Sequence, residues 1–152
     1  MMHTRIKNGD WIVICDGRKA LLFENAGDEE FPNFKTREVL EHKSEANRDI
    51  DADKPGRVHE SATAGRSAIE QVDHHDLEET AFLAQVSKRL DELVAGGEVR
   101  HLVVVAPPRA LGAIRKTYSA GLRAAIRTEI DQDLVKMPID EIETKFALRN
   151  NV

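Results

Sequence analysis

A short apolar strand followed at once by two prolines and a helix is the segment that most restricts how this chain can fold. Leu102 to Ala106 contains no polar residue, as is typical of a strand buried on both faces of a sheet. Pro107 and Pro108 end the strand, and proline suits the first turn of the helix that follows. Ligands of α/β sheets usually bind at the carboxyl ends of the strands. We therefore look for a functional site at this junction.

Three earlier segments predict an antiparallel part of the same sheet. Residues 11–15 (WIVIC) are apolar and rich in β-branched side chains, as expected of a central strand. Asp16-Gly17 is a tight-turn signal, so residues 20–23 should return beside the first strand as a hairpin. The more polar residues 36–42 predict a third strand at the edge of the sheet.

Helical signals connect these strands to two later ones. The predicted helices begin at Asp76, Pro108, Ser119 and Pro138, and the strands among them are residues 102–106 and 126–130. Because both later strands follow helices, they should run parallel to their neighbours. The sequence thus predicts an α/β fold with one mixed five-stranded sheet, in which three antiparallel strands precede the parallel ones. Helices should cover both faces.

The length of 152 residues fits a single domain over residues 1–152. Residues from about 43 to 75 have no sustained apolar period and contain the breakers Pro55-Gly56 and Gly65. Loops of this length inside a domain are normally functional or mobile. We therefore expect a long mobile loop at about 43–75, with a helix starting only at Asp76.

Composition and charge restrict the location and the class of partner. The formal net charge of −5 argues against a protein that coats nucleic acid by bulk attraction, although a local basic face is compatible with it. Cys15 is the single cysteine, which fits a reducing compartment and a buried structural thiol. The first residues lack the apolar core of a secretory signal, and the apolar runs of roughly five residues are too short to cross a bilayer. These features predict a cytoplasmic protein without a membrane partner.

The helix after Pro108 is the best candidate for a binding site. Arg109, Gly112 and Lys116 are spaced i, i+3 and i+7, which places them on one face of a helix. Gly112 costs about 1 kcal/mol relative to alanine, but it leaves room between two cations for a phosphate or a neighbouring backbone. Tight helix–sheet packing beside a solvated basic face is the alternative interpretation. The full candidate set for an anion or partner is Pro108, Arg109, Gly112, Arg115, Lys116, Asp16 and Arg18.

No catalytic, metal or cofactor site is predicted from the side-chain pattern. Asp73-His74-His75-Asp76 resembles a metal cluster, but adjacent residues point in different directions, whereas ligand pairs need spacings such as i,i+4. A solvated approach to the helix explains that stretch better. The serines and threonines near residues 61–67 lack the strand–turn–helix setting of a nucleophile.

Several segments resemble one bacterial family. They are residues 11–20 (WIVICDGRKA), 54–57 (KPGR), 102–115 (LVVVAPPRALGAIR) and 133–136 (DLVK). Together they look like the host attachment proteins, a bacterial family of release-factor-like domains named for attachment of plant-associated bacteria to host cells. The order of elements is similar to the ribonuclease-H-like topology and to the middle domain of archaeo-eukaryotic peptide-chain release factors. The resemblance implies a ribonuclease-H-like core.

Two classes of function remain open. The first is a non-catalytic intracellular binding module that engages RNA, a ribosome or a protein partner through the basic helix. The alternative is a metal-dependent phosphodiester hydrolase of ribonuclease-H-like type. A direct adhesin is disfavoured because no secretion signal is visible.

The resemblance itself argues for binding rather than catalysis. Ribonuclease-H-like enzymes place carboxylates on the first strand, on the first helix and at the end of the fourth strand. Asp16 and either Glu78 or Glu79 match the first two, but the predicted fourth strand ends in Ala106 and prolines. Release factors act through a Gly-Gly-Gln tip, whereas the nearest match here, Gly96-Gly97-Glu98, lies at a predicted helix end.

Overall fold

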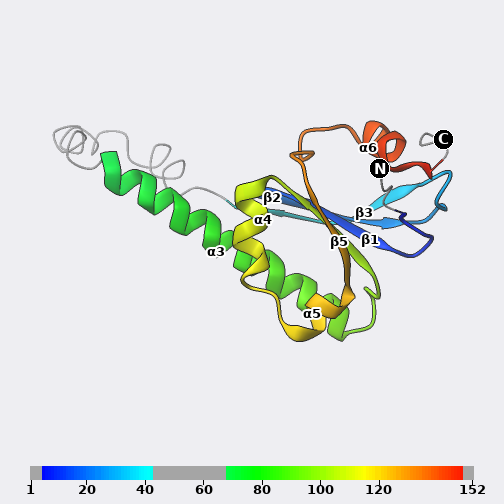
Figure 1. Ribbon diagram of the computed structural model, residues 1–152, viewed down its shortest axis with the longest axis horizontal. Coiled ribbons are helices and arrows are strands. Elements are labelled where there is room, and N and C mark those ends of the chain that lie inside the picture. The colour runs from blue at the N-terminus through cyan, green and yellow to red at the C-terminus, as the bar shows by residue number, and fades with distance from the viewer. Residues whose placement is uncertain (1–4, 43–67, 149–152) are drawn as a thin grey trace.

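The computed structural model describes residues 5–42 and 68–148, and its five strands form one sheet in the order β3-β2-β1-β4-β5 (Figure 1). The strands are β1 (Trp11–Cys15), β2 (Lys19–Asn25), β3 (Phe34–Glu41), β4 (Leu102–Ala106) and β5 (Ile126–Asp131). Pairing is antiparallel between β1 and β2 and between β2 and β3, and parallel between β1 and β4 and between β4 and β5. The mixed five-stranded sheet predicted from the sequence is confirmed.

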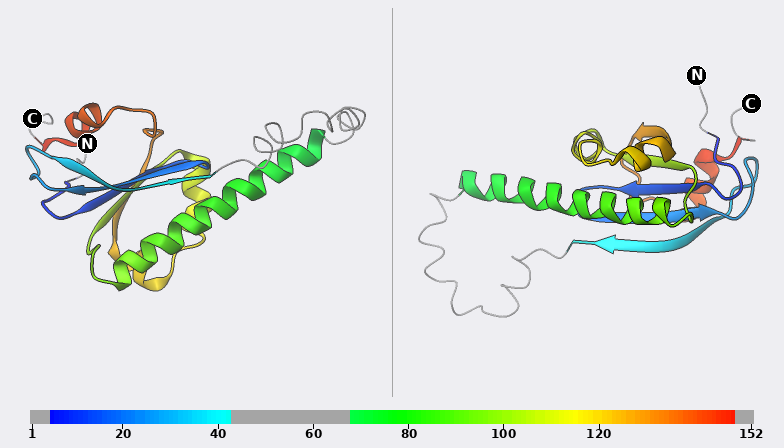
Figure 2. Two further views of the ribbon diagram at one scale, coloured as in Figure 1. Left: turned by 180° about the vertical axis from the view of Figure 1, so that it is seen from behind. Right: turned by 90° about the horizontal axis from the view of Figure 1, so that it is seen from below.

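Helices lie on both faces of this sheet, as expected (Figure 2). They are α3 (Ala68–Ala95), α4 (Pro108–Arg115), α5 (Ala120–Ala125) and α6 (Ile139–Phe146). The first three share a core with one face of β1 and β4, and α6 packs on the opposite face. Although α3 has 28 residues, none of the helices in these two described ranges is apolar enough to cross a membrane.

The continuous apolar runs are explained by burial of the two central strands on both sides. Every residue of β1 and of β4 is buried. Val13 and Val104 face the α3 side, while Ile12 and Val103 face the α6 side. Because side chains of a strand alternate between the faces, a strand covered by helices on both sides can have no polar position.

The helix α3 starts eight residues before the predicted position, so the prediction that the loop extends to residue 75 is wrong. No glycine or proline occurs between Gly65 and Gly96, and nothing in the local sequence stops the helix from extending toward its amino end. This amino-terminal part projects past the sheet (Figures 1 and 2). Leu77, expected on the buried stripe, is 69% exposed for this reason. The rest of the predicted loop, residues 43–67, lies outside the described residues.

Candidate functional site

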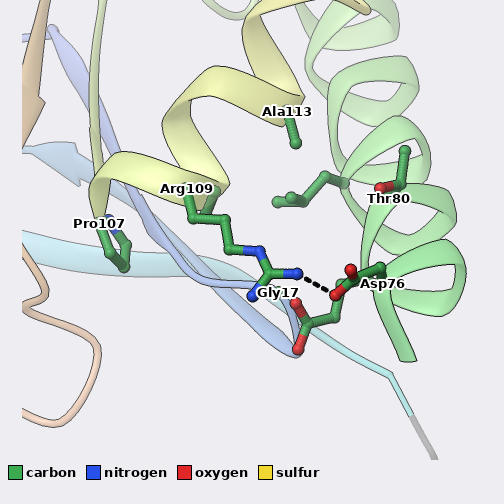
Figure 3. Close-up of a pocket in the computed structure, with 9 residues that line it drawn as sticks. Gly17, Asp76, Thr80, Pro107, Arg109 and Ala113 are labelled. Carbon is green, nitrogen blue, oxygen red and sulfur yellow. Dashed lines mark hydrogen bonds and ion pairs between the residues drawn. The ribbon is translucent and has the colours of Figure 1, made fainter. Parts of the chain in front are cut away.

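A cleft of about 370 Å³ lies where α3 and α4 meet the turn after β1 (Figure 3). Because β1 and β4 are parallel neighbours, their carboxyl ends reach the same sheet edge, and Gly17 and Pro107 both line the cleft. Pro108 occupies the first position of α4, as predicted, and the Leu111 N–H donates to the Pro107 carbonyl at 2.8 Å. The cleft is lined by Gly17, Asp76, Glu79, Thr80, Leu83, Pro107, Arg109, Ala110 and Ala113.

The charges of this cleft do not favour an anion. The Arg109 guanidinium, expected to be an anion-binding group, donates through Nη2 to the Asp76 carboxylate on α3 (Figure 3). Glu79 lies directly over Gly17, so that a Cβ atom there would be only 2.7 Å from the Glu79 Cδ. Two carboxylates against one guanidinium leave the lining with a formal charge of −1. Arg109 is therefore present at the predicted edge but already neutralised.

Gly112 and Lys116 do not line that cleft. A Cβ atom at Gly112 would meet no atom within 4 Å, so close backbone packing does not explain the glycine. Lys116 is the exposed C-cap residue of α4. At 1.5 Å per residue it lies roughly 10 Å along the helix from Arg109. The predicted cationic face is thus divided between the two ends of α4.

The carboxyl end of α4 and the start of α5 carry a second group of cations. Arg115 donates to Glu129 Oε1 through Nε at 3.0 Å, and its Nη2 is 2.9 Å from the same oxygen. Tyr118 Oη donates to the other oxygen of Glu129 at 2.9 Å. The Arg123 guanidinium lies over the Tyr118 ring, 5.4 Å from its centroid. We call Arg115, Lys116 and Arg123 the α4–α5 cationic surface.

The hydrogen bonds of Glu129 also shift the proton affinities of its partners. The bond to Glu129 raises the pKa of Arg115 above its ordinary value. Burial, followed by the bond to Glu129, raises the pKa of Tyr118. Both side chains therefore keep their protons, and Tyr118 presents a neutral ring beneath Arg123.

Arg123 and Tyr118 were not singled out from the sequence, although a signal was present. Residues 107–128 contain five cations and no aspartate or glutamate, in a chain with a net charge of −5. Asp76, Glu129 and Asp10 neutralise Arg109, Arg115 and Arg127. Within the described part of the chain, Lys116 and Arg123 have no carboxylate partner.

Asp16 and Arg18, also in the predicted set, lie in a different groove of about 570 Å³. Asp16 Oδ1 accepts the backbone N–H groups of Arg18 and Lys19, each at 2.8 Å. This side chain therefore shapes the β1–β2 turn. The groove is lined by Asp16, Arg18, Lys19, Glu41, His42, Val135 and Lys136.

The carboxylates considered for the hydrolase alternative do not form a metal-binding group within the described residues. Asp16 lines the groove, Glu79 lines the cleft, and Glu78 Oε2 is 3.7 Å from His42 Nε2. Among the residues described, no three His, Cys, Asp or Glu side chains are placed to hold one metal ion. The carboxyl end of β4 supplies only Ala106 and Pro107.

The Gly96-Gly97-Glu98 segment caps α3, as predicted. Gly97 has a φ of +84°, the left-handed conformation that ends many helices. The N–H of Glu98 donates to the Leu93 carbonyl at 3.0 Å, and that of Gly97 to the Val94 carbonyl at 3.1 Å. These two bonds form a Schellman motif. The segment is therefore fully explained by its capping role.

Comparison with known proteins identifies relatives of this arrangement. Residues 10–146, from β1 to the end of α6, match the model of the bacterial archaeo-eukaryotic release factor family 12. A 70-residue stretch is 29% identical to an uncharacterized protein of Rickettsia prowazekii. That match covers 45% of this chain and 47% of the relative, so the chain spans about half the length of the curated protein it matches.

Proposed function

The chain belongs to the bacterial archaeo-eukaryotic release factor family 12, and from this premise we propose that it is a non-catalytic module that binds RNA, most simply ribosomal RNA. The α4–α5 cationic surface is the proposed contact. The host-attachment resemblance fits this proposal if attachment to host cells is an indirect consequence of RNA binding in the cytoplasm.

The observation that carries the proposal is the local excess of positive charge. Lys116 and Arg123 lie in a 22-residue segment without a carboxylate, and neither is paired with an acid elsewhere in the described ranges. Affinity for nucleic acid comes largely from cations that replace the counterions of phosphates. The Arg123 guanidinium also lies over the Tyr118 ring, and arginine and aromatic side chains are groups on which bases stack. Both features suit single-stranded RNA.

The catalytic alternative has less support. Asp16 lines the groove and Glu79 lines the cleft, and β4 ends in Ala106 without the third carboxylate that such an enzyme needs. The sequence contains no Gly-Gly-Gln tripeptide of the kind that release factors use. A non-catalytic binding module therefore explains these residues more simply than a hydrolase or a peptide-release enzyme does.

The test is a titration of labelled single-stranded RNA at low salt, followed by fluorescence anisotropy. Lys116→Gln/Arg123→Gln should weaken binding by about tenfold, since two charge-assisted contacts are lost. Lys35→Gln/Lys145→Gln is the matched control, because it removes the same charge from exposed residues on β3 and α6. Equal affinity of the first variant and the wild-type protein would overturn the proposal. Recovery of ribosomal RNA with the full-length protein from its native cell should depend on the same two residues.

A further inference from the structure

We propose that the groove beside the β1–β2 turn is a second site, which binds a phosphate monoester or free phosphate. It lies between the β1–β2 turn, the end of β3 and the loop that leads from β5 to α6. Arg18, Lys19 and Lys136 bring three cations into it from two of these segments. The site does not depend on the RNA-binding proposal, because none of its lining residues belongs to the α4–α5 cationic surface.

The three cations of the groove are unpaired, in contrast to most arginines of the described sheet and helices. Arg37, Arg89, Arg109, Arg115 and Arg127 each pair with a carboxylate. No carboxylate in the two described ranges forms an ion pair with Arg18, Lys19 or Lys136. Lys19 is the cross-strand neighbour of Glu41, so the charges of Arg18 and Lys136 are the most available to a ligand.

The backbone that carries these side chains is fixed from several directions. The N–H groups of Arg18 and Lys19 are held by Asp16, and the Arg18 carbonyl accepts the His42 N–H at 2.8 Å. Lys136 lies on a turn closed by the Met137 N–H, which donates to the Leu134 carbonyl at 3.1 Å. Leu134 anchors that turn in the core on the α6 side of the sheet. A backbone that is already fixed reduces the entropy lost on binding an anion to the ordering of the cationic side chains themselves.

The remaining charges in the groove leave an excess of positive charge. Asp16 and Glu41 are its two acids, and one oxygen of Asp16 already accepts two backbone N–H groups. Three cations against two carboxylates give the lining residues a formal charge of +1. Three separate cations suit a terminal phosphate, with up to two negative charges shared over three oxygens, better than a carboxylate with one charge over two.

The experiment is an NMR titration of the full-length protein that follows its backbone amide signals. The probes are inorganic phosphate, a nucleoside 5′-monophosphate and an oligonucleotide without a terminal phosphate. The first two should shift the amides of residues 16–19 and 135–136 in a saturable way, and their relative affinities distinguish free phosphate from a phosphate monoester. Arg18→Gln/Lys136→Gln should weaken this binding by about tenfold. Lys35→Gln/Lys145→Gln again serves as the matched control and should leave it unchanged.

Three results would overturn the assignment. The first is that neither phosphate probe gives saturable shifts in the groove. The second is that the Arg18→Gln/Lys136→Gln variant binds phosphate as tightly as the wild-type protein does. The third is that the unphosphorylated oligonucleotide binds in the groove more tightly than the phosphate probes do. The Lys116→Gln/Arg123→Gln variant should retain phosphate binding. Failure of the RNA proposal and failure of the phosphate site are therefore separate outcomes.

Discussion

Gly112 occupies a position where alanine fits the backbone and the surrounding space. Its φ is not in the left-handed region, and a Cβ atom would meet no atom within 4 Å. Glycine inside a helix is less favourable than alanine by about 1 kcal/mol. We therefore expect Gly112→Ala to raise the free energy of unfolding by up to about 1 kcal/mol in chemical denaturation. A loss of stability would show that α4 needs the bare backbone at this position.

Cys15 should be inert to thiol reagents as long as the protein is folded. Burial, with a smaller contribution from the charge of Asp16, raises the pKa of its thiol from 9.0 to about 12. At about pH 8 iodoacetamide should modify only the unfolded chain, because the thiolate is the reactive form. Modification of the native protein as fast as of the denatured protein would contradict this.

The same shift of the Cys15 pKa predicts how stability changes in alkaline solution. A thiol whose pKa is raised by folding stabilises the native state fully below pH 9.0, the unfolded value. Between there and about pH 12 the unfolded chain loses this proton and the folded chain keeps it, so stability should fall as the pH rises. Denaturation of Cys15→Ala over this range is the control, and its stability should fall less steeply.

At the scale of elements, Ser119 caps α5 and also joins it to α3. Its Oγ accepts the Leu122 N–H at 3.0 Å and donates to Asp91 Oδ1 at 2.6 Å. Ser119→Ala should lower the free energy of unfolding by about 1–2 kcal/mol, since both bonds are lost. Ser119→Thr keeps the hydroxyl and should remain close to the wild-type protein in the same denaturation experiment. If Ser119→Ala and Ser119→Thr lowered the free energy of unfolding equally, the effect would come from packing and not from the hydrogen bonds of the hydroxyl.

The two ends of α3 show which boundaries the sequence predicts. The carboxyl end was predicted correctly because Gly96-Gly97 acts locally, through a left-handed residue and two backbone hydrogen bonds. The predicted position of the amino end was wrong. Asp76 and Glu79 have the spacing of a capping box, but their side chains contact other parts of the fold. Asp76 pairs with Arg109, 33 residues away, and Glu79 covers Gly17. Such long-range partners leave no mark in the local sequence.

At the scale of the whole molecule, the sheet was predictable and the division of the candidate site was not. The apolar runs of β1 and β4 and the prolines after Ala106 define the sheet and its carboxyl edge through local rules. Helical spacing grouped Arg109 with Lys116, but it does not reveal that carboxylates on α3 and β5 neutralise Arg109 and Arg115. The local sequence also does not reveal that Asp16 and Arg18 line a separate groove. That placement depends on which distant segments the fold brings together.

This distribution of charge makes a quantitative prediction about salt. A protein with a net charge of −5 should engage RNA only through local cationic regions, so only a few phosphates can be contacted. For single strands the logarithm of affinity falls with the logarithm of salt concentration with a slope of about −0.7 for each neutralised phosphate. If Lys116 and Arg123 each contact one phosphate, Lys116→Gln/Arg123→Gln should reduce the slope by about 1.4 between about 50 and 200 mM salt. Lys35→Gln/Lys145→Gln should leave it unchanged, and an equal slope in all three proteins would mean that RNA binds elsewhere on the molecule.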